Sequence, residues 1–364
     1  MWLKLERRPL PSRAMRYGSP LITLVLTAVI GTGLFIFLGR DPLEAFHAVF
    51  VTPVSSLFGV GELLIKASPL MLIAIGLTIG FRANVWNIGA EGQLVMGAIA
   101  GGGLAIYFHD ADSAFLLPAM VLAGALGGGL WAAIPAVLRT RFNANEILTT
   151  LMLNYIALLF LGYLVYGPWR DPGAFNLPQS RVFESAGLFP ILVEGTRLHA
   201  GIFVSLAAVA AGWFFMHRSF LGYQMRVAGL SDAAARYSGI SPKRIVWVSM
   251  LIGGVAAGVA GVGEVAGPVG QLLPVISPGY GFAAIIVAFV GRLHPVGIVL
   301  ASLLMALLYL GGEAAQMDLN LPAAITGLFQ GMLLFILLGM EVFITYRLRV
   351  VGTPARRLVQ GAAA

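Results

Sequence analysis

The chain has 364 residues and a formal net charge of +7, and 59% of its residues are hydrophobic while only 11% are charged. Because a soluble domain carries roughly a quarter of charged residues, this composition, with a mean hydropathy of +0.89, excludes water as the main solvent of the chain. The absence of cysteine excludes disulfides, thiolate nucleophiles and cysteine metal sites.

Apolar stretches that are long enough to cross a lipid bilayer recur along nearly the whole chain. A spanning helix needs about 20 mostly apolar residues, because every backbone amide in the hydrocarbon core must be hydrogen-bonded internally. The sequence therefore predicts an all-α, polytopic integral membrane bundle of about ten transmembrane helices, with broken helices at two points. The spans are predicted near residues 18–38, 63–81, 94–108, 115–138, 147–167, 199–216, 245–263, 280–291, 295–312 and 322–345.

The first apolar run follows a basic N-terminus and therefore has the charge pattern of a signal peptide. The run is longer than a typical signal core, and residues 39–42 offer no small-x-small cleavage pattern. We therefore expect it to remain in the protein as the first span.

The distribution of basic residues orients the bundle through the positive-inside rule. With a cytoplasmic N-terminus, all but five of the 23 Lys and Arg residues fall on the cytoplasmic side, where they act as topology signals and do not indicate nucleic-acid binding. We therefore expect both termini in the cytoplasm, with a basic N-terminus over residues 1–17, one transmembrane domain over 18–345 and a basic tail over 346–364. The cations expected on the other face are Arg40, Lys66, Arg170, Arg181 and Arg197.

Two hydrophilic segments are long enough to have their own structure. Residues 168–198 contain several Pro and Gly residues and aromatic side chains, which favour an ordered external loop. Residues 217–244 lie on the cytoplasmic side and contain a helix-like stretch at 231–238, which Gly239 ends as a C-cap. We expect a short amphipathic helix there.

The first predicted break lies within residues 81–93, where polar side chains stand among glycines between two apolar runs. Polar groups and irregular backbone are tolerated at membrane depth where they line a wet cavity or are buried in protein, and transporters place substrate sites at interrupted helices. The alternative is a plain cytoplasmic loop between two hairpin helices. The residues that this interpretation selects are Trp86, Asn87, Glu91 and Gln93.

The second predicted break lies within residues 261–282, where Gly and Pro are too dense for a regular helix. Glu264 stands at the end of an apolar helix, and Gln271, Ser277 and Tyr280 add hydrogen-bonding groups. Two broken elements, one in each half, indicate a binding site or gate between the halves. A structural re-entrant loop without ligand contact is the alternative.

Asn154 interrupts the fifth predicted span. A buried Asn often bonds a neighbouring helix and has no further role, so pathway lining and helix bridging both stay open. Small residues at four-residue spacing, such as Gly254 and Gly258, predict close helix packing.

The sequence contains no recognisable catalytic constellation and no paired His residues of the kind a metal site needs. We therefore assign no catalytic residue, metal or cofactor, and we do not expect an enzyme. The chain also has no Gly-x-x-x-x-Gly-Lys-Ser/Thr phosphate-binding loop, so ATP-driven work would need a second chain.

Several motifs resemble the permeases of ABC importers of the branched-chain amino acid and ribose type. They are Asn-Ile-Gly-Ala-Glu-Gly-Gln at residues 87–93, Thr-Thr-Leu-Met-Leu-Asn-Tyr at 149–155, Ala-Gly-Leu-Ser-Asp-Ala-Ala-Ala-Arg-Tyr-Ser-Gly-Ile at 228–240, and the run from Gly-Tyr-Gly-Phe to His-Pro at 279–295. The resemblance covers residues 60–345. Within that family the chain is most similar to permeases of nucleoside and simple-sugar importers that work with a basic-membrane-protein type of binding lipoprotein.

The resemblance implies a multi-pass protein of the bacterial plasma (inner) membrane with three kinds of partner. They are cytoplasmic ABC ATPase subunits, a second and different permease chain, and an external solute-binding lipoprotein. It also implies that residues 222–242 are the coupling segment for the ATPase, although Ser-Asp-Ala-Ala at 231–234 departs from the Glu-Ala-Ala pattern of the best-known coupling loops. The implied coupling residues are Gly222, Asp232, Ala234, Arg236 and Gly239.

The resemblance further implies that both breaks line or gate a path for a small-molecule solute. The pathway residues are Trp86, Asn87, Glu91, Gln93, Asn154, Glu264, Gln271, Tyr280 and Phe282. We expect the permease subunit of an ABC importer for a nucleoside, with a simple sugar of the ribose kind as the alternative. An ion-coupled secondary transporter with Glu91 or Glu264 as the coupling group is a rival from another class, and an intramembrane enzyme lacks paired catalytic groups.

Overall fold

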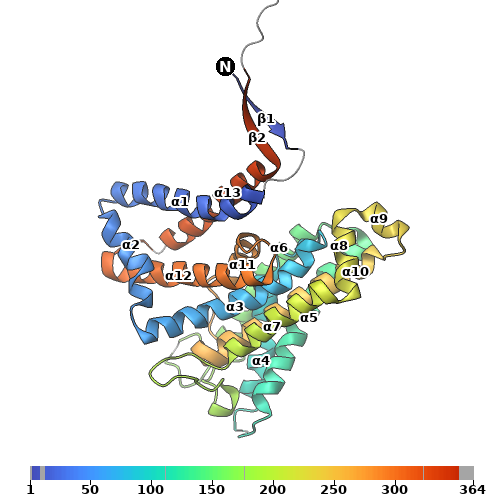
Figure 1. Ribbon diagram of the computed structural model, residues 1–364. Coiled ribbons are helices and arrows are strands. Elements are labelled where there is room, and N and C mark those ends of the chain that lie inside the picture. Colours follow the sequence, from blue (N-terminus) through green and yellow to red (C-terminus); the bar gives the residue numbers. More distant parts are fainter. Residues whose placement is uncertain (1, 9–12, 111, 176, 323, 352–364) are drawn as a thin grey trace, which may run out of the picture. The chain divides into compact units, whose positions relative to one another are not determined.

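The computed structural model describes residues 2–8, 13–110, 112–175, 177–322 and 324–351. In this part of the chain the elements are helices apart from one two-stranded ribbon (Figure 1). The chain divides into two compact units. One contains the described parts of Met1–Pro42 and Gly327–Ala364, and the other spans Leu43–Thr326.

The first unit combines the two ends of the chain. Its elements are β1 (Trp2–Arg7), α1 (Arg13–Phe37), most of α13 (Ala324–Thr345) and β2 (Tyr346–Val351). Helices α1 and α13 are in contact through Phe35 and Phe329, whose ring centroids are 5.6 Å apart.

The two terminal segments form an antiparallel ribbon that was not predicted from the sequence. Trp2 pairs with Val351 and Arg7 pairs with Tyr346 at its two ends. The residues of both strands alternate between apolar and charged types over much of their length, which is the period-two pattern of a strand. The prediction took these residues only as basic topology signals, although their alternation is visible in the sequence.

The second unit is a bundle of helices joined by short turns and one long loop. Its α-helices are α2 (Pro42–Phe50), α3 (Leu57–Arg82), α4 (Ala90–Tyr107), α5 (Leu116–Phe142), α6 (Glu146–Tyr166), α7 (Gly201–Arg218), α8 (Phe220–Leu230), α9 (Asp232–Tyr237), α10 (Pro242–Glu264), α11 (Tyr280–Val290) and α12 (Pro295–Leu319). Two 3-10 turns, η1 (Thr52–Val54) and η2 (Ser185–Gly187), and a π-helical turn, η3 (Val265–Val269), complete it.

Each predicted span overlaps one helix: α1, α3, α4, α5, α6, α7, α10, α11, α12 or α13. Among the described residues, six helices are long and apolar enough to cross a membrane by length and composition: α3, α5, α6, α7, α10 extended through η3, and α12. The total of about ten spans therefore stays a prediction. Helices α2 and α8 were not predicted.

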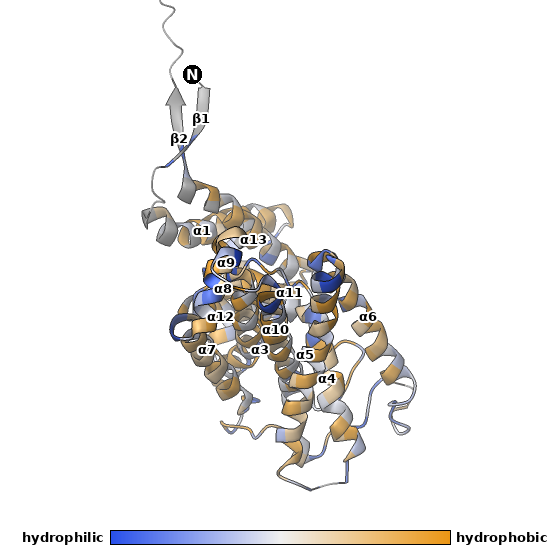
Figure 2. Cartoon of the chain, turned by 90° about the vertical axis from the view of Figure 1, so that its right-hand side faces the viewer, coloured by the Kyte–Doolittle hydropathy of each residue, from blue (hydrophilic) through white to orange (hydrophobic). Residues whose placement is uncertain are grey.

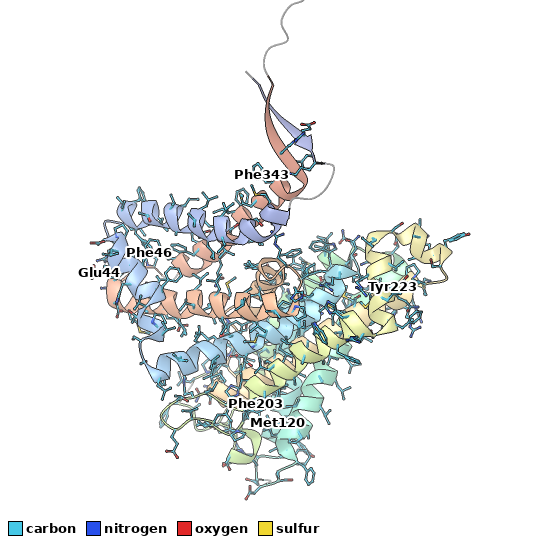
Figure 3. The ribbon with its side chains drawn as sticks, viewed as in Figure 1. Glu44, Phe46, Met120, Phe203, Tyr223 and Phe343 are labelled. Atoms are coloured by element: carbon cyan, nitrogen blue, oxygen red, sulfur yellow. The ribbon has the colours of Figure 1, made fainter. Side chains whose placement is uncertain are left out.

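Helix α3 is the central helix of the second unit. Its own side chains are apolar on all of its faces, and every residue from Ala67 to Phe81 is buried. A helix that is apolar all round is either buried or membrane-embedded, and α10, α11, α12 and α7 pack against α3. The outer helices α5, α6 and α7 expose many apolar side chains, such as Phe203 on α7 (Figure 3), as expected for surfaces that face lipid.

Glycines allow α10 to approach α4 and α5 with almost no gap. A Cβ atom on Gly258 would overlap the carbonyl oxygen of Gly124, and a Cβ on Gly97 would overlap the backbone of Gly258. Small residues at helix crossings are how helices associate where lipid removes the hydrophobic driving force. The predicted glycine pair of α10, Gly254 and Gly258, therefore forms a real packing surface.

Hydrophilic residues gather at the two ends of this bundle. Figure 2 shows them on α8 and α9 at one end and in the loops at the other, with apolar helices between. Helix α9 begins where Ser231 accepts a hydrogen bond from the Ala234 amide at 3.2 Å, and it ends at Tyr237, two residues before Gly239, whose φ is +74°. The expected short helix over 231–238 and its glycine C-cap are both present in the structure.

We expect the substitution Gly258→Ala to destabilise the bundle, because the new methyl group would push α10 away from Gly124 and Gly128. Overpacking of this kind costs about 1–3 kcal/mol. Gly263→Ala is the matched control on the same helix, since nothing lies within 4 Å of the position that a Cβ would take there and alanine favours a helix by up to about 1 kcal/mol. Thermal unfolding of the detergent-purified variants measures the difference, and equal stability of the two would contradict the packing argument.

Candidate functional site

The first break is a seven-residue connection between α3 and α4 whose polar side chains bond one another. Asn87 and Gln93 exchange hydrogen bonds: the Asn87 amide donates to Gln93 at 2.9 Å and the Gln93 amide donates to Asn87 at 3.2 Å. The Gly89 amide also donates to Asn87 Oδ1 at 2.9 Å. Both side chains are almost fully buried, so these hydrogen bonds stabilise the backbone conformation of the break.

Helix α6 supports the same break from the side. Asn154 accepts a hydrogen bond from the Gly92 amide at 2.8 Å and donates to the Ile88 carbonyl at 2.9 Å. Thr150 accepts from the Ile88 amide at 3.2 Å. Each bond satisfies a backbone group that the interrupted helix leaves unpaired, and an unpaired buried group of this kind is costly. Bridging between α6 and the break therefore accounts for both the oxygen and the nitrogen of the Asn154 side-chain amide.

Glu91 joins the first break to the second. Its Oε2 atom accepts a hydrogen bond of 2.7 Å from the Gly281 amide, and the Ser277 side chain interacts with the same carboxylate. Gly281 lies in the first turn of α11, where unpaired amides and the helix dipole favour a negative charge. A Cβ on Gly281 would overlap the backbone of Glu91, so glycine is required for this close contact.

The second break begins where α10 widens into η3, and its backbone is supported by the long loop between α6 and α7. Ser180 N donates to the Leu272 carbonyl at 3.0 Å, Phe183 N to the Gly270 carbonyl at 2.8 Å and Phe189 N to the Ala266 carbonyl at 2.8 Å. The loop thus runs along the break like a neighbouring strand. Gln271 reaches the same loop, since its amide donates to Gln179 at 3.4 Å.

A cavity of about 350 Å³ lies where the second break meets α3, α12 and the residue stretch before α7. This volume is within the range of small-ligand pockets, about 300–1,000 Å³. Charged and hydroxyl side chains make up much of its wall, and apolar residues supply the rest. The polar lining residues are Glu62, Lys66, Arg197, Glu264, Ser277, Tyr280 and Glu313.

Two ion pairs cross this cavity wall. Arg197 donates to both oxygens of Glu62, at 2.9 and 2.5 Å, and Lys66 lies 2.8 Å from Glu313. The hydrogen bonds to Glu62 raise the pKa of the Arg197 guanidinium above its ordinary value, so Arg197 is cationic at every physiological pH. Glu264 lies on the same wall, is 6% exposed, and has no hydrogen-bond or ion-pair partner among the described residues.

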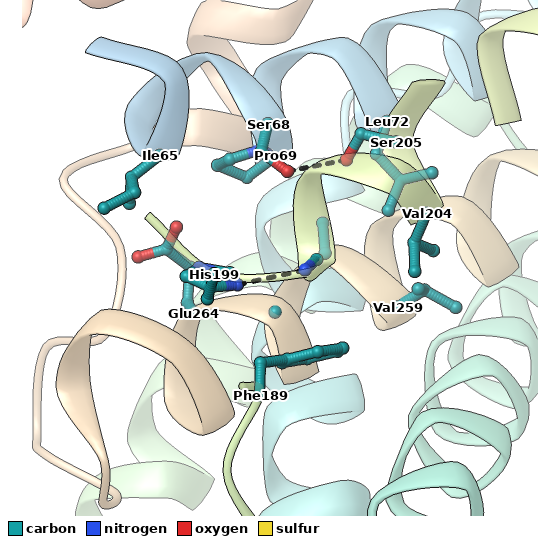
Figure 4. Close-up of a pocket in the computed structure, with 13 residues that line it drawn as sticks. Ile65, Ser68, Pro69, Leu72, Phe189, His199, Val204, Ser205, Val259 and Glu264 are labelled. Atoms are coloured by element: carbon teal, nitrogen blue, oxygen red, sulfur yellow. Dashed lines mark hydrogen bonds between the residues drawn. The ribbon is translucent and has the colours of Figure 1, made fainter. Parts of the chain in front are cut away.

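A second, much smaller cavity of about 20 Å³ lies on the other side of Glu264. Figure 4 shows the Ser68 and Ser205 hydroxyls bonded to each other at 2.7 Å, and His199 Nδ1 accepting from the Gly201 amide at 3.2 Å. This volume holds about one water molecule. It separates α3 from α7 and is too small for a solute.

The predicted pathway residues fall into three groups. Glu264 and Tyr280 both line the large cavity. The ring of Tyr309 packs edge-on against the ring of Tyr280, with their centroids 5.5 Å apart. Glu91 lies beside them at the start of α11. The amides Asn87, Gln93, Asn154 and Gln271 bond backbone, one another or the loop, as given above.

Two aromatic residues of the predicted set lie elsewhere. Trp86 stacks on Phe289 at 5.8 Å, near the far end of α11, and donates to Asn84 at 3.1 Å. Phe282 is 40% exposed and does not line the large cavity. Neither ring is therefore positioned to stack on a solute in that cavity.

Four cavity residues were not selected from the sequence: Glu62, Lys66, Arg197 and Glu313. A signal was present, because Glu62 and Lys66 are four residues apart on one face of an otherwise apolar helix, and ionisable residues within such helices mark functional sites. Their partners come from distant parts of the chain. No group of three or more His, Cys, Asp or Glu residues within the described ranges is arranged to hold a metal ion.

The predicted coupling segment forms α8 and α9. Gly222 packs on the Phe215 carbonyl, and Gly229 packs on the Arg82 carbonyl at the end of α3. Ala234 and Arg236 are exposed on α9, and Gly239 follows the end of that helix. Asp232 begins α9, and its side chain lies outside the described residues.

Comparisons with known proteins agree over most of the chain. The model of a family described as the branched-chain amino acid transport system permease component matches residues 59–338. The glucose ABC transporter permease protein of Haloferax volcanii is 36% identical over 96% of this chain and 94% of that protein. The guanosine ABC transporter permease protein of Bacillus subtilis is 32% identical, covering 84% and 88%. The nucleoside ABC transporter permease protein of Lactococcus lactis is 27% identical, covering 87% and 89%.

The Glu91–Gly281 bond predicts a local effect of substitution. In Glu91→Ala the Gly281 amide loses its acceptor, which costs about 1–3 kcal/mol, and Glu91→Gln keeps a neutral acceptor at the same place. Hydrogen exchange over residues 278–284 is therefore expected to accelerate in Glu91→Ala and much less in Glu91→Gln. Glu44→Ala, at an exposed position, is the control. Unchanged exchange in Glu91→Ala would show that the carboxylate does not hold the start of α11.

Proposed function

We infer that this chain, which belongs to the family of branched-chain amino acid transport system permease components, is the membrane-spanning subunit of an ABC importer for a neutral, hydroxyl-rich solute. The chain is a multi-pass protein of the inner membrane, as its family and its several apolar helices establish. The observation that carries the proposed function is the polar cavity of about 350 Å³ beside the joined breaks.

A nucleoside is the solute that we propose first, with a monosaccharide as the second candidate. Two of the relatives are named for guanosine or nucleoside transport, and the relative of higher identity is named for glucose. These solutes are all uncharged and carry hydroxyl groups on neighbouring ring carbons. The polar lining of the cavity suits such molecules, because carboxylate and hydroxyl groups accept their hydrogen bonds.

The proposed solute path begins at the cavity and passes Glu264 and Tyr280. Glu91 keeps the start of α11 next to the first break, so we propose that it positions the path and does not bind the solute. We extend the same positioning role to the remaining predicted residues, whose contacts within the protein support it: Trp86, Asn87, Gln93, Asn154, Gln271 and Phe282.

We propose that α8 and α9 form the coupling segment for a cytoplasmic ABC ATPase. The exposed surface of α9 and its short, capped form suit insertion into a partner, and Gly222 and Gly229 connect α8 to α7 and α3. Gly222, Asp232, Ala234, Arg236 and Gly239 are the proposed coupling residues. The complete importer would contain two ATPases, a second permease chain and an external binding lipoprotein.

The proposed orientation places both termini and the α8–α9 end in the cytoplasm. It also makes residues 168–198 an external loop and residues 18–345 one functional transmembrane domain. The positive-inside distribution of Lys and Arg supports this arrangement. The large cavity, which lies beside that loop, would then open toward the outside.

A C-terminal reporter tests the orientation. We expect alkaline phosphatase, which is active only outside the cytoplasm, to be inactive when fused after residue 351, and to be active when inserted in the 168–198 loop. A cytoplasmic reporter at the same two positions should give the opposite pattern. Alkaline phosphatase activity at the C-terminal fusion would refute the proposed orientation.

Uptake by the reconstituted importer tests the function. Together with its partner ATPase, second permease and binding lipoprotein, the chain in vesicles is expected to accumulate adenosine or glucose only when ATP is supplied to the ATPase. An importer lacking residues 230–240 should lose uptake, and its ATP hydrolysis should no longer respond to the loaded lipoprotein. Uptake that ignores ATP and stops when the ion gradient is collapsed would favour the secondary-transporter alternative.

A further inference from the structure

The cavity that lies between α3, α12 and the second break contains an uneven set of charged groups. Three carboxylates line it, those of Glu62, Glu264 and Glu313, and two cations, Lys66 and Arg197. Arg197 is engaged by Glu62 and Lys66 by Glu313, at the distances given above. One carboxylate, that of Glu264, is therefore left without a partner among the described residues.

Glu264 is held where an unpaired acceptor is costly. It is the last residue of α10, directly before η3, and only 6% of its surface is exposed. Figure 4 shows its carboxylate in the space between Ile65 and His199. A buried polar group needs compensating hydrogen bonds. The small cavity beside Glu264 has room for about one water molecule, so the large cavity is the side from which a solute can supply them.

We propose that Glu264 is the specificity-determining acceptor for two neighbouring hydroxyl groups of an uncharged solute, an inference that rests on the proposed transport function. The two oxygens of a carboxyl group can form hydrogen bonds with both hydroxyls of a vicinal diol at once. In dinucleotide-binding folds an Asp or Glu side chain hydrogen-bonds the ribose 2′-hydroxyl. A diol on a furanose ring and a diol on a pyranose ring satisfy this chemistry equally.

The surrounding charges disfavour the other ligands of a carboxylate. A solute phosphate or carboxylate would enter a cavity in which both cations are already paired with Glu62 and Glu313, so no free cation would stabilise its charge. A metal ion or organic cation would enter next to the positive charges of Lys66 and Arg197, which line the same cavity. Neutral donors avoid both penalties, which is why the proposal names an uncharged diol.

The experiment compares solutes with and without the diol in the complete reconstituted importer. Adenosine is paired with 3′-deoxyadenosine and glucose with 2,4-dideoxyglucose, neither of which has hydroxyls on neighbouring ring carbons, and kcat/KM for uptake is measured for wild type and for Glu264→Gln. The variant keeps the shape of the side chain and replaces one acceptor oxygen by a donor. The binding lipoprotein is the same in both importers, so its own preference cancels from the comparison.

We expect Glu264→Gln to reduce kcat/KM about tenfold for the diol-bearing solute, the effect of losing one hydrogen bond to a buried group. The deoxy solute should change much less. The preference for the diol should therefore shrink by the same factor, and Glu264→Asp should restore part of it. Glu44→Gln, the same change at an exposed position on α2 outside the cavity, should leave the preference for the diol unchanged.

The outcomes separate the inference from the proposed function. If Glu264→Gln lowers uptake of both members of a pair by the same factor, Glu264 has a general structural role and the inference is wrong, while ATP-driven transport stands. If the wild-type importer transports neither adenosine nor glucose, the proposed solute class fails and the inference fails with it. Thermal stability of the Glu264→Gln permease is measured alongside, so that a folding defect is recognised as a structural role.

Discussion

The hydrogen bond from the Gly281 amide to the Glu91 carboxylate is the contact on which the organisation of the site depends. A broken helix in an apolar surrounding leaves backbone groups that must find partners within the protein. At this point one break supplies the acceptor and the other supplies the donor. The two irregular segments, almost two hundred residues apart in the sequence, are therefore fixed side by side, and the cavity forms next to their junction.

The two breaks use their polar residues differently. In the first break, Asn87 and Gln93 complete each other's hydrogen bonds, so little bonding capacity remains for a ligand. In the second, the backbone is satisfied by the long loop, and Glu264 stays unbonded beside the cavity. Clustered Asn and Gln side chains in a sequence thus indicate where a helix break must be stabilised. An unpaired buried carboxyl group instead indicates where a ligand would supply the missing hydrogen bonds.

The sequence predicted the positions of the long helices well, because a run of about 20 apolar residues is a strong local signal. It predicted the short helix at 231–238 from its cap residues as well. The terminal ribbon was missed, since each strand needs the other end of the chain as its partner. The same reason explains the missed ion pairs: Glu62 meets Arg197 only through tertiary folding, and no local pattern pairs them.

Helix α3 connects the two ends of the bundle, so any mechanical coupling between them depends on how this helix can move. Its last residue, Arg82, is in backbone contact with Gly229 of α8, while Lys66 on the same helix lines the cavity. At 1.5 Å per residue these two positions are about 24 Å apart along the axis. A displacement of α8 toward or away from the bundle must therefore move a single buried helix or bend it. Because glycines hold α10 close to α4 and α5 with no spare volume, α3 has the freedom to tilt mainly on its other side, toward α7 and α12. That is the side that carries Arg197 and Glu313, so a tilt of α3 would shift Glu62 and Lys66 relative to their partners in both ion pairs of the cavity wall.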